Sequence, residues 1–128
     1  MPHLTQKSGY TNVTAMKQSR IFENPTDCPV VHTMSIIGGR WKPIILYCLM
    51  GGKLRFGKLA LFIPTISRKI LTEQLKELEN YGLIKREEFN ELPPKVEYSL
   101  TELGKSLIPV INAICTWGQN EGRTVATK

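Results

Sequence analysis

The sequence is poor in cysteine, and its three cysteines, Cys28, Cys48 and Cys115, do not stand in paired spacings such as C-x-x-C. An odd number of widely separated cysteines favours free thiols in a reducing compartment over a disulfide framework. Long apolar stretches are also missing, because no run approaches the roughly 18 residues that span a bilayer. The N-terminal stretch MPHLTQKSGY lacks the apolar core of a signal peptide. We therefore expect a soluble, cytoplasmic protein without a membrane partner.

Groups for catalysis and for metal binding are scarce as well. Of the two histidines, His3 lies in the N-terminal stretch and His32 follows Cys28 by four residues. A zinc site would need more ligands than this one pair. There is no nucleophile–base pair, no phosphate-binding glycine loop and no pair of carboxylates at a suggestive spacing. The sequence therefore predicts no enzyme, no metal and no cofactor.

Positive charge is what the chain has in excess. Its 128 residues include 17 Lys+Arg and 11 Asp+Glu, for a formal net charge of +6. This balance favours a polyanionic partner, although many basic proteins bind none. The length fits one domain with arms. We expect a partly flexible N-terminal arm over residues 1–26, a domain over 27–118 and a flexible tail over 119–128.

The most strongly patterned stretch, residues 56–83, predicts two helices joined by a tight turn. Pro64 disfavours the helical conformation of the preceding residue and has no N–H to donate, so the first helix should end near Phe62. The second helix should begin at Ser67, whose hydroxyl can accept a hydrogen bond from the first turn, and end before Gly82. Two short helices with such a turn are typical of a helix-turn-helix.

The second of these helices, residues 67–81, has one apolar side and one basic side. The apolar side carries Leu71, Leu75 and Leu78. We expect the basic side to enter the major groove of DNA, where Arg and Lys can donate to guanine and Thr can meet a thymine methyl group or a phosphate. Its candidate residues are Arg68, Lys69, Thr72 and Lys76. Thr65 and Ser67, at the positive end of the helix, are candidate phosphate contacts. A helical hairpin with a merely solvated basic side would show the same pattern.

A β-hairpin is predicted directly after this helix, over residues 84–100. Its strand candidates are residues 84–90 and 95–100; the second alternates apolar and polar residues, and prolines between the two cannot continue a ladder. A basic helix followed by a hairpin is the order of a winged helix-turn-helix. We therefore expect a mainly α fold with a small β-hairpin, in the α+β class.

The short piece 53–56 is expected to form a third strand beside that hairpin. From this flanking strand and from the wing, Arg55 and Lys95 are candidates for contacts to the DNA backbone.

The last helix should begin at Thr101 and carries an unusually wide apolar face. Its main stripe steps by 4, 3, 4 and 3 residues, as in a heptad pattern. The stripe consists of Leu103, Leu107, Val110, Ile114 and Trp117. Pro109 should kink the helix by removing a backbone hydrogen bond. Either the helix packs twice onto its own core, or the stripe forms a homodimer interface with help from the N-terminal arm. We favour the homodimer.

A further helix is predicted to begin at Pro29, which places Cys28 at its N-cap, and to end at the pair of glycines 38–39. Free N–H groups and the helix dipole stabilise a thiolate at such a position, and His32 could add positive charge. Cys28 is therefore a candidate redox sensor. The simpler interpretation is that it caps the helix and packs.

Three segments of the chain resemble the HxlR-type winged helix-turn-helix regulators, relatives of the MarR group. They are CPVVHTMSIIGGRWKPIILYCLM, LRFGKLALFIPTISRKILTEQLKELENYGLIKREEF and PPKVEYSLTELGKSLIPVINAICTWG, and they cover about residues 28–118. The resemblance implies a homodimeric bacterial transcription regulator with a dimer interface built from terminal helices. It also implies that some members sense oxidants or electrophiles through the cysteine that aligns with Cys28.

The expected function is sequence-specific binding of double-stranded DNA at a pseudo-palindromic operator, read by residues 67–81 and the wing. Thiol modification of Cys28 would gate this binding, and a disulfide to the other chain could use either Cys48 or Cys115. The alternative is a MarR-like regulator gated by a small molecule at the dimer interface, with Cys28 purely structural. A winged helix used only for protein contact fits the basic helix less well.

Overall fold

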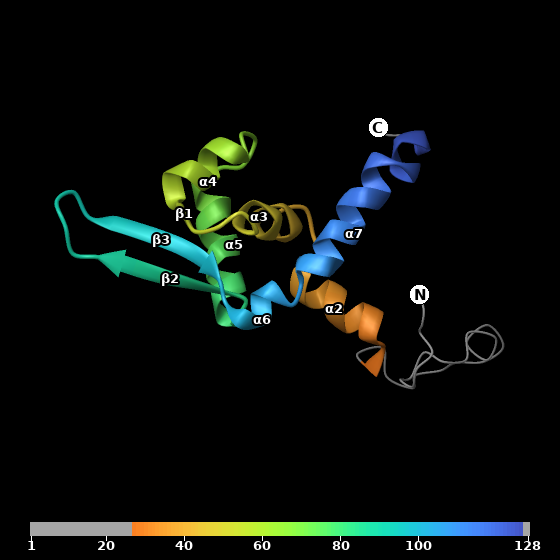
Figure 1. Cartoon of the computed structure of the whole chain (residues 1–128), viewed down its shortest axis with the longest axis horizontal. Coiled ribbons are helices and arrows are strands. Elements are labelled where there is room, and N and C mark those ends of the chain that lie inside the picture. Colours follow the sequence, from red (N-terminus) through yellow and green to blue (C-terminus); the bar gives the residue numbers. More distant parts are fainter. Residues whose placement is uncertain (1–26, 127–128) are drawn as a thin grey trace. The chain divides into compact units, whose positions relative to one another are not determined.

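The computed structural model describes residues 27–126, which divide into two compact units with the boundary after Ser35. None of the helices in this range is long and apolar enough to cross a membrane. The elements, labelled in Figure 1, are α2 (Pro29–Ile37), α3 (Lys42–Leu49), β1 (Leu54–Arg55), α4 (Phe56–Phe62), α5 (Arg68–Asn80), β2 (Ile84–Phe89), β3 (Lys95–Leu100), α6 (Glu102–Lys105), α7 (Ile108–Gln119) and the 3-10 helix η2 (Glu121–Thr124).

Helix α5 begins and ends where the sequence predicts. The hydroxyl of Ser67 accepts a hydrogen bond from the backbone N–H of Ile70, which satisfies a donor of the first turn. At the other end Gly82 has φ +78°, a conformation that costs glycine little. The backbone N–H of Leu83 donates to the carbonyl of Leu78 at 3.0 Å, and that of Gly82 to Glu79 at 2.9 Å. This is the Schellman pattern, so both ends of the helix are fixed by local chemistry.

The three strands form an antiparallel sheet in the order β1-β3-β2. The hairpin and the third strand are therefore confirmed, although Phe56 belongs to α4 rather than to β1. Pairing of Ile84 with Leu100 and of Arg86 with Tyr98 places these residues on one face of the hairpin. In Figure 1 the tip of the hairpin extends away from the helices of the same unit, as a wing does.

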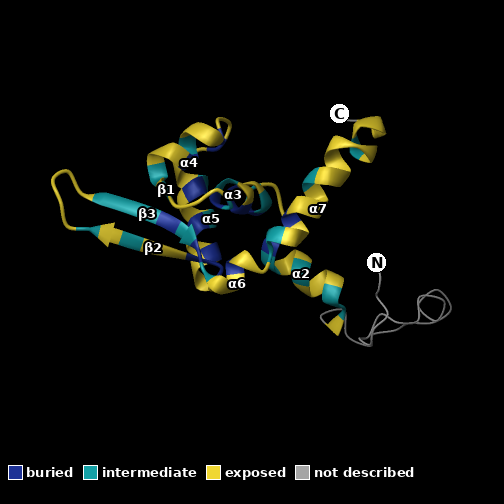
Figure 2. Cartoon of the chain, viewed as in Figure 1, coloured by how far each residue is buried: buried dark blue, intermediate teal, exposed yellow. Residues whose placement is uncertain are grey.

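The core lies where α3, α5 and the inner part of the hairpin meet. Figure 2 shows buried residues along α3 and α5 and at the end of β3. Three residues of α3 and the three leucines of α5 are almost fully buried. They are Ile45, Leu46, Leu49, Leu71, Leu75 and Leu78. This core fixes the back of α5 and leaves its other side exposed.

The final helix is not one kinked helix but two helices, and here the prediction is wrong. Thr101 caps α6 as expected, its hydroxyl accepting from the backbone N–H of Gly104 at 3.0 Å. Helix α6 then ends at Lys105, and Leu107 donates to Gly104 in a tighter turn. Because Pro109 has no N–H, it cannot bond back across this turn, and it is instead accommodated in the first turn of α7.

Two further segments differ in detail from the pattern of the sequence. Within α2, Val30 and Met34 are exposed, whereas Ile37 is buried in the core of the second unit. Residues 119–128 are expected to form a flexible tail, but Glu121–Thr124 form the 3-10 helix η2. The N-terminal arm lies outside the described residues.

Candidate nucleic-acid interface

The outer side of α5 presents the four residues expected to face the major groove. Arg68, Lys69, Thr72 and Lys76 are all exposed, opposite the buried leucines. The guanidinium of Arg68 lies over the ring of Phe56, 5.4 Å from its centre, which steadies a long side chain at the start of the helix. Lys69 donates to Glu73 at 2.8 Å, and this hydrogen bond raises the pKa of Lys69. The side is thus cationic and outward-facing, as a reading surface requires.

Thr65 and Ser67 lie in and just after the turn between α4 and α5, and both are exposed. The oxygen of the Ser67 hydroxyl already caps α5, but its own proton can still be donated. The free backbone N–H groups of the first turn of α5 lie at the positive end of the helix dipole. The turn therefore offers donors suited to a phosphate.

Lys42, at the start of α3, holds α5 from behind. Its side chain forms an ion pair with Glu77 and donates to Gln74 at 3.1 Å, and the residue is only 8% exposed. A buried charge needs such partners, since an unpaired one would be strongly destabilising. No pattern in the sequence indicates this role, because the lysine stands 35 residues from Glu77 at a helix start.

Arg55 and Lys95 lie on adjacent strands but in different surroundings. Arg55 is exposed at the end of β1. Lys95 is half-buried, with its ammonium 4.5 Å from the centre of the Phe89 ring and within 4.0 Å of carboxylate oxygens of Glu91 and Glu97. These contacts compete with any phosphate for Lys95, so Arg55 is the more available of the two.

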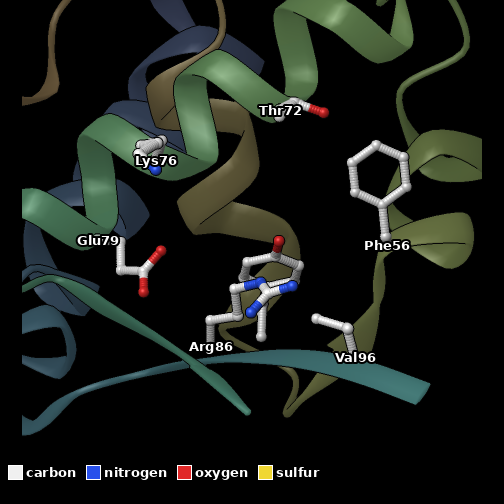
Figure 3. A pocket seen from close by; sticks show the side chains of 7 residues that line it. Phe56, Thr72, Lys76, Glu79, Arg86 and Val96 are labelled. Carbon is white, nitrogen blue, oxygen red and sulfur yellow. The ribbon is translucent and has the colours of Figure 1, made fainter. Parts of the chain in front are cut away.

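A cavity of about 500 Å³ lies between the outer side of α5 and the wing. Two of the predicted residues, Thr72 and Lys76, line it together with five that the sequence analysis did not single out. These five are Phe56, Glu79, Arg86, Val96 and Tyr98. Figure 3 shows Glu79 and Arg86 reaching into the space below Lys76 and Thr72. The pairing of the two hairpin strands could have indicated Arg86, because this pairing places Arg86 beside Tyr98 on the face toward α5.

The three cysteines have different environments. Cys28 is half-buried directly before α2, and its thiol is free. Burial raises the pKa of the Cys48 thiol, which makes that thiol less reactive at neutral pH. Cys115 donates to the hydroxyl of Tyr47 at 4.0 Å and lines a hollow of about 280 Å³ between α3 and α7. Across residues 27–126 no three His, Cys, Asp or Glu side chains gather in a way that could hold a metal.

Known proteins share this arrangement. Residues 36–125 match the family described as HxlR-like helix-turn-helix. The chain is 42% identical over 104 residues to YybR of Bacillus subtilis, an uncharacterized HTH-type transcriptional regulator, covering 81% of this chain and 83% of that protein. The solved structure of the redox regulator HypR in its oxidized form is similar with a TM-score of 0.70 and 46% identity, covering 72% of this chain and 95% of that one.

A third relative is the transcriptional regulator YodB of B. subtilis, whose reduced form has been solved. It is similar with a TM-score of 0.63 and 40% identity, over 71% of this chain and 90% of that one. These proteins resemble this chain in sequence, and the two solved structures also resemble it in fold. The chain therefore belongs to the HxlR-like helix-turn-helix family, a family of transcriptional regulators and not of enzymes.

Proposed function

We propose that the chain binds double-stranded DNA as a homodimer and regulates transcription from a pseudo-palindromic operator. The observation that carries this proposal is the outward cationic side of α5, a helix whose two ends and whose back are fixed by the rest of the fold. In each protomer α5 would lie in the major groove and the β2–β3 wing would follow the backbone beside it. Arg55, Thr65, Ser67 and Lys95 would supply backbone contacts.

The homodimer is supported by the apolar stripe of the C-terminal helices. Leu103, Val110, Ile114 and Trp117 are each more than a third exposed. Large apolar side chains in such a row are unusual on a monomer surface and are typical of interfaces between subunits. Because Ile111 on the inner side of α7 is buried in the chain's own core, the exposed stripe is left for a partner.

The test of this function is binding to a palindromic duplex from the chain's own upstream DNA. We expect a complex of one dimer per duplex, and a half-site duplex should bind much more weakly because only one α5 can be engaged. Affinity should fall steeply as salt rises, since each neutralised phosphate releases condensed cations. Fluorescence anisotropy at several salt concentrations measures both effects. Equal affinity for the palindrome and the half-site would contradict the two-fold arrangement.

Gating of this DNA binding by Cys28 is supported by the relatives and by the position of the thiol. HypR is described as a redox regulator, and it is similar to this chain over 95% of its own length. Cys28 precedes α2, a helix that ends in the buried residue Ile37. Oxidation or alkylation would add bulk or polarity at one end of this helix, and Ile37 would pass a shift to the core that supports α5.

We expect Cys28 to react with electrophiles faster than an ordinary exposed cysteine, and DNA binding to change when it does. Cys48 is the internal control, because burial raises the pKa of its thiol and should slow its reaction. The measurement is thiol-reactivity kinetics against pH for the wild type and for Cys28→Ser, with DNA binding under oxidant. A Cys28→Ser variant that responds to oxidant as the wild type does would show that Cys28 only caps its helix.

Gating by a small molecule is the second candidate, and the hollow between α3 and α7 favours it. The walls come from Pro43, Ile44 and Tyr47 of α3 and from Ile111, Ile114 and Cys115 of α7. These side chains are mostly apolar, with one hydroxyl and one thiol to orient a ligand. Ile114 belongs both to the hollow and to the exposed stripe, so a ligand there would lie at the proposed dimer interface.

A further inference from the structure

The cavity between α5 and the wing combines cationic side chains from two elements that are separate in the sequence. Lys76 reaches it from α5 and Arg86 from β2, while Thr72 adds a hydroxyl. Lys76 makes no ion pair with any of the residues that the structure describes. The walls are completed by Phe56, Val96 and the ring of Tyr98. An open space with two cations and a hydroxyl on its rim suits an anion with several oxygen atoms.

Arg86 is held at this cavity by two partners. Its guanidinium forms an ion pair with Glu88 at 2.6 Å and also interacts with Tyr98, its neighbour across the hairpin, and both interactions raise the pKa of Arg86. Arg86 and Glu88 are two residues apart on one strand and therefore share the face toward α5. Because Glu88 is 67% exposed, water screens this ion pair and the pair is easily exchanged.

We propose that this cavity is the seat of a DNA backbone phosphate, and that Arg86 exchanges Glu88 for the phosphate when DNA binds. The proposal rests on the DNA-binding function and adds a contact to it that is independent of sequence. A guanidinium presents its donors as a planar fork that fits a phosphate as well as a carboxylate. Glu88 thus engages, in the unbound protein, donors of the Arg86 guanidinium that a phosphate oxygen takes in the complex.

Two neighbouring residues define how the phosphate sits. The hydroxyl of Tyr98 keeps the guanidinium pointed at α5 when Glu88 leaves, so it is a positioning residue. The carboxylate of Glu79 also reaches into the cavity (Figure 3) and would repel a phosphate. The phosphate is therefore placed on the side of Thr72 and Lys76, away from Glu79. This position lies beside the reading side of α5, where the backbone flanking a major groove passes.

The test uses matched substitutions on β2 in the full-length chain. Arg86→Gln removes the proposed contact, and Lys85→Gln removes the same charge from the opposite face of the same strand. Glu88→Gln removes the competitor, and Glu87→Gln is its control on the opposite face. Affinity is measured by fluorescence anisotropy on the operator duplex and on an unrelated duplex over a range of salt concentrations. Thermal melting confirms that each variant is folded.

Arg86→Gln is expected to lose affinity on the order of tenfold on both duplexes alike. Its salt dependence should become shallower by about 0.9 in the logarithmic slope for each phosphate that is no longer neutralised, hence about 1.8 for a dimer. Glu88→Gln should gain affinity roughly threefold on both duplexes with an unchanged slope. Lys85→Gln should change the affinity and the slope less than Arg86→Gln does, and Glu87→Gln should change the affinity less than Glu88→Gln does.

A second probe identifies the phosphate itself. Uncharged methylphosphonates are placed one at a time along the duplex backbone. One position in each half-site should weaken binding of the wild type and have no further effect on Arg86→Gln. If Arg86→Gln binds both duplexes as Lys85→Gln does, the proposal is overturned, whereas loss of binding on substitution of Arg68, Lys69 and Lys76 would still uphold DNA reading by α5. Saturable binding of inorganic phosphate that requires Arg86, with DNA affinity unchanged by Arg86→Gln, would also overturn the proposal.

Discussion

Replacing Arg68, Lys69 and Lys76 together by alanine is expected to reduce DNA affinity on the order of 10³-fold or more. Each of these side chains is exposed on the outer side of α5. A base contact contributes about 1–3 kcal/mol, and removing a phosphate contact has a comparable effect that also lowers the salt dependence. None of the three is buried, so the free energy of unfolding should change little. Anisotropy with the palindromic duplex measures the affinity, and thermal melting measures the stability.

The matched control removes the same three charges elsewhere in the same unit. Lys85, Lys105 and Arg123 are exposed and lie outside the cavity and the outer side of α5. Their joint replacement by alanine should lower the DNA affinity only slightly, because it removes only long-range attraction to DNA, which salt screens. If the α5 variant binds no more weakly than this control, α5 is not the reading helix. Single variants then separate the roles, because a base contact relaxes specificity at one position and a phosphate contact weakens all sequences equally.

The double substitution Val110→Glu and Ile114→Glu is expected to convert the dimer to a monomer. Both side chains are exposed in one chain and stand one helical turn apart on α7, in the middle of the stripe. Two carboxylates per protomer would meet their symmetry mates across an apolar interface, where unpaired charge is strongly unfavourable. Leu107 is less suitable for this test because it packs against the core of its own chain. Light scattering at micromolar concentration gives the mass.

The control for this substitution places the same charges on the opposite side of α7. Asn112→Glu with Thr116→Glu keeps the spacing of four residues, and both positions are exposed. This variant should remain dimeric and bind the palindrome as the wild type does. The stripe variant should bind the palindrome no better than a half-site, because two α5 helices are no longer linked. A wild-type protein that is monomeric at micromolar concentration would rule out the dimer proposal.

Elements with local causes could be predicted from the order of the residues alone. The ends of α5 follow from the Ser67 hydroxyl and from the left-handed conformation of Gly82, and each acts within one turn of the helix. The strands of the wing follow from the alternation of residues 95–100, since a shift by one residue would expose the buried side. Helix α4 ends at Phe62 because Pro64 disfavours the helical conformation of the residue before it, which is also a local cause. The family resemblance then added the expectation of a bacterial transcription regulator to the DNA binding that these patterns already indicated.

Contacts between elements that are far apart in the chain depend instead on how the whole fold packs. Lys42 is buried because α3 packs behind α5 and brings Glu77 to it, a partner that spacing along one helix cannot reveal. Arg86 lines the cavity beside α5 because the hairpin register and the packing of α5 enclose that cavity. The need for glycine at position 104 likewise depends on packing, because Gly104 lies so close to the backbone of Leu83 that a side chain would collide. Local rules set where helices and strands begin and end, whereas burial and ion pairing depend on which of them pack together.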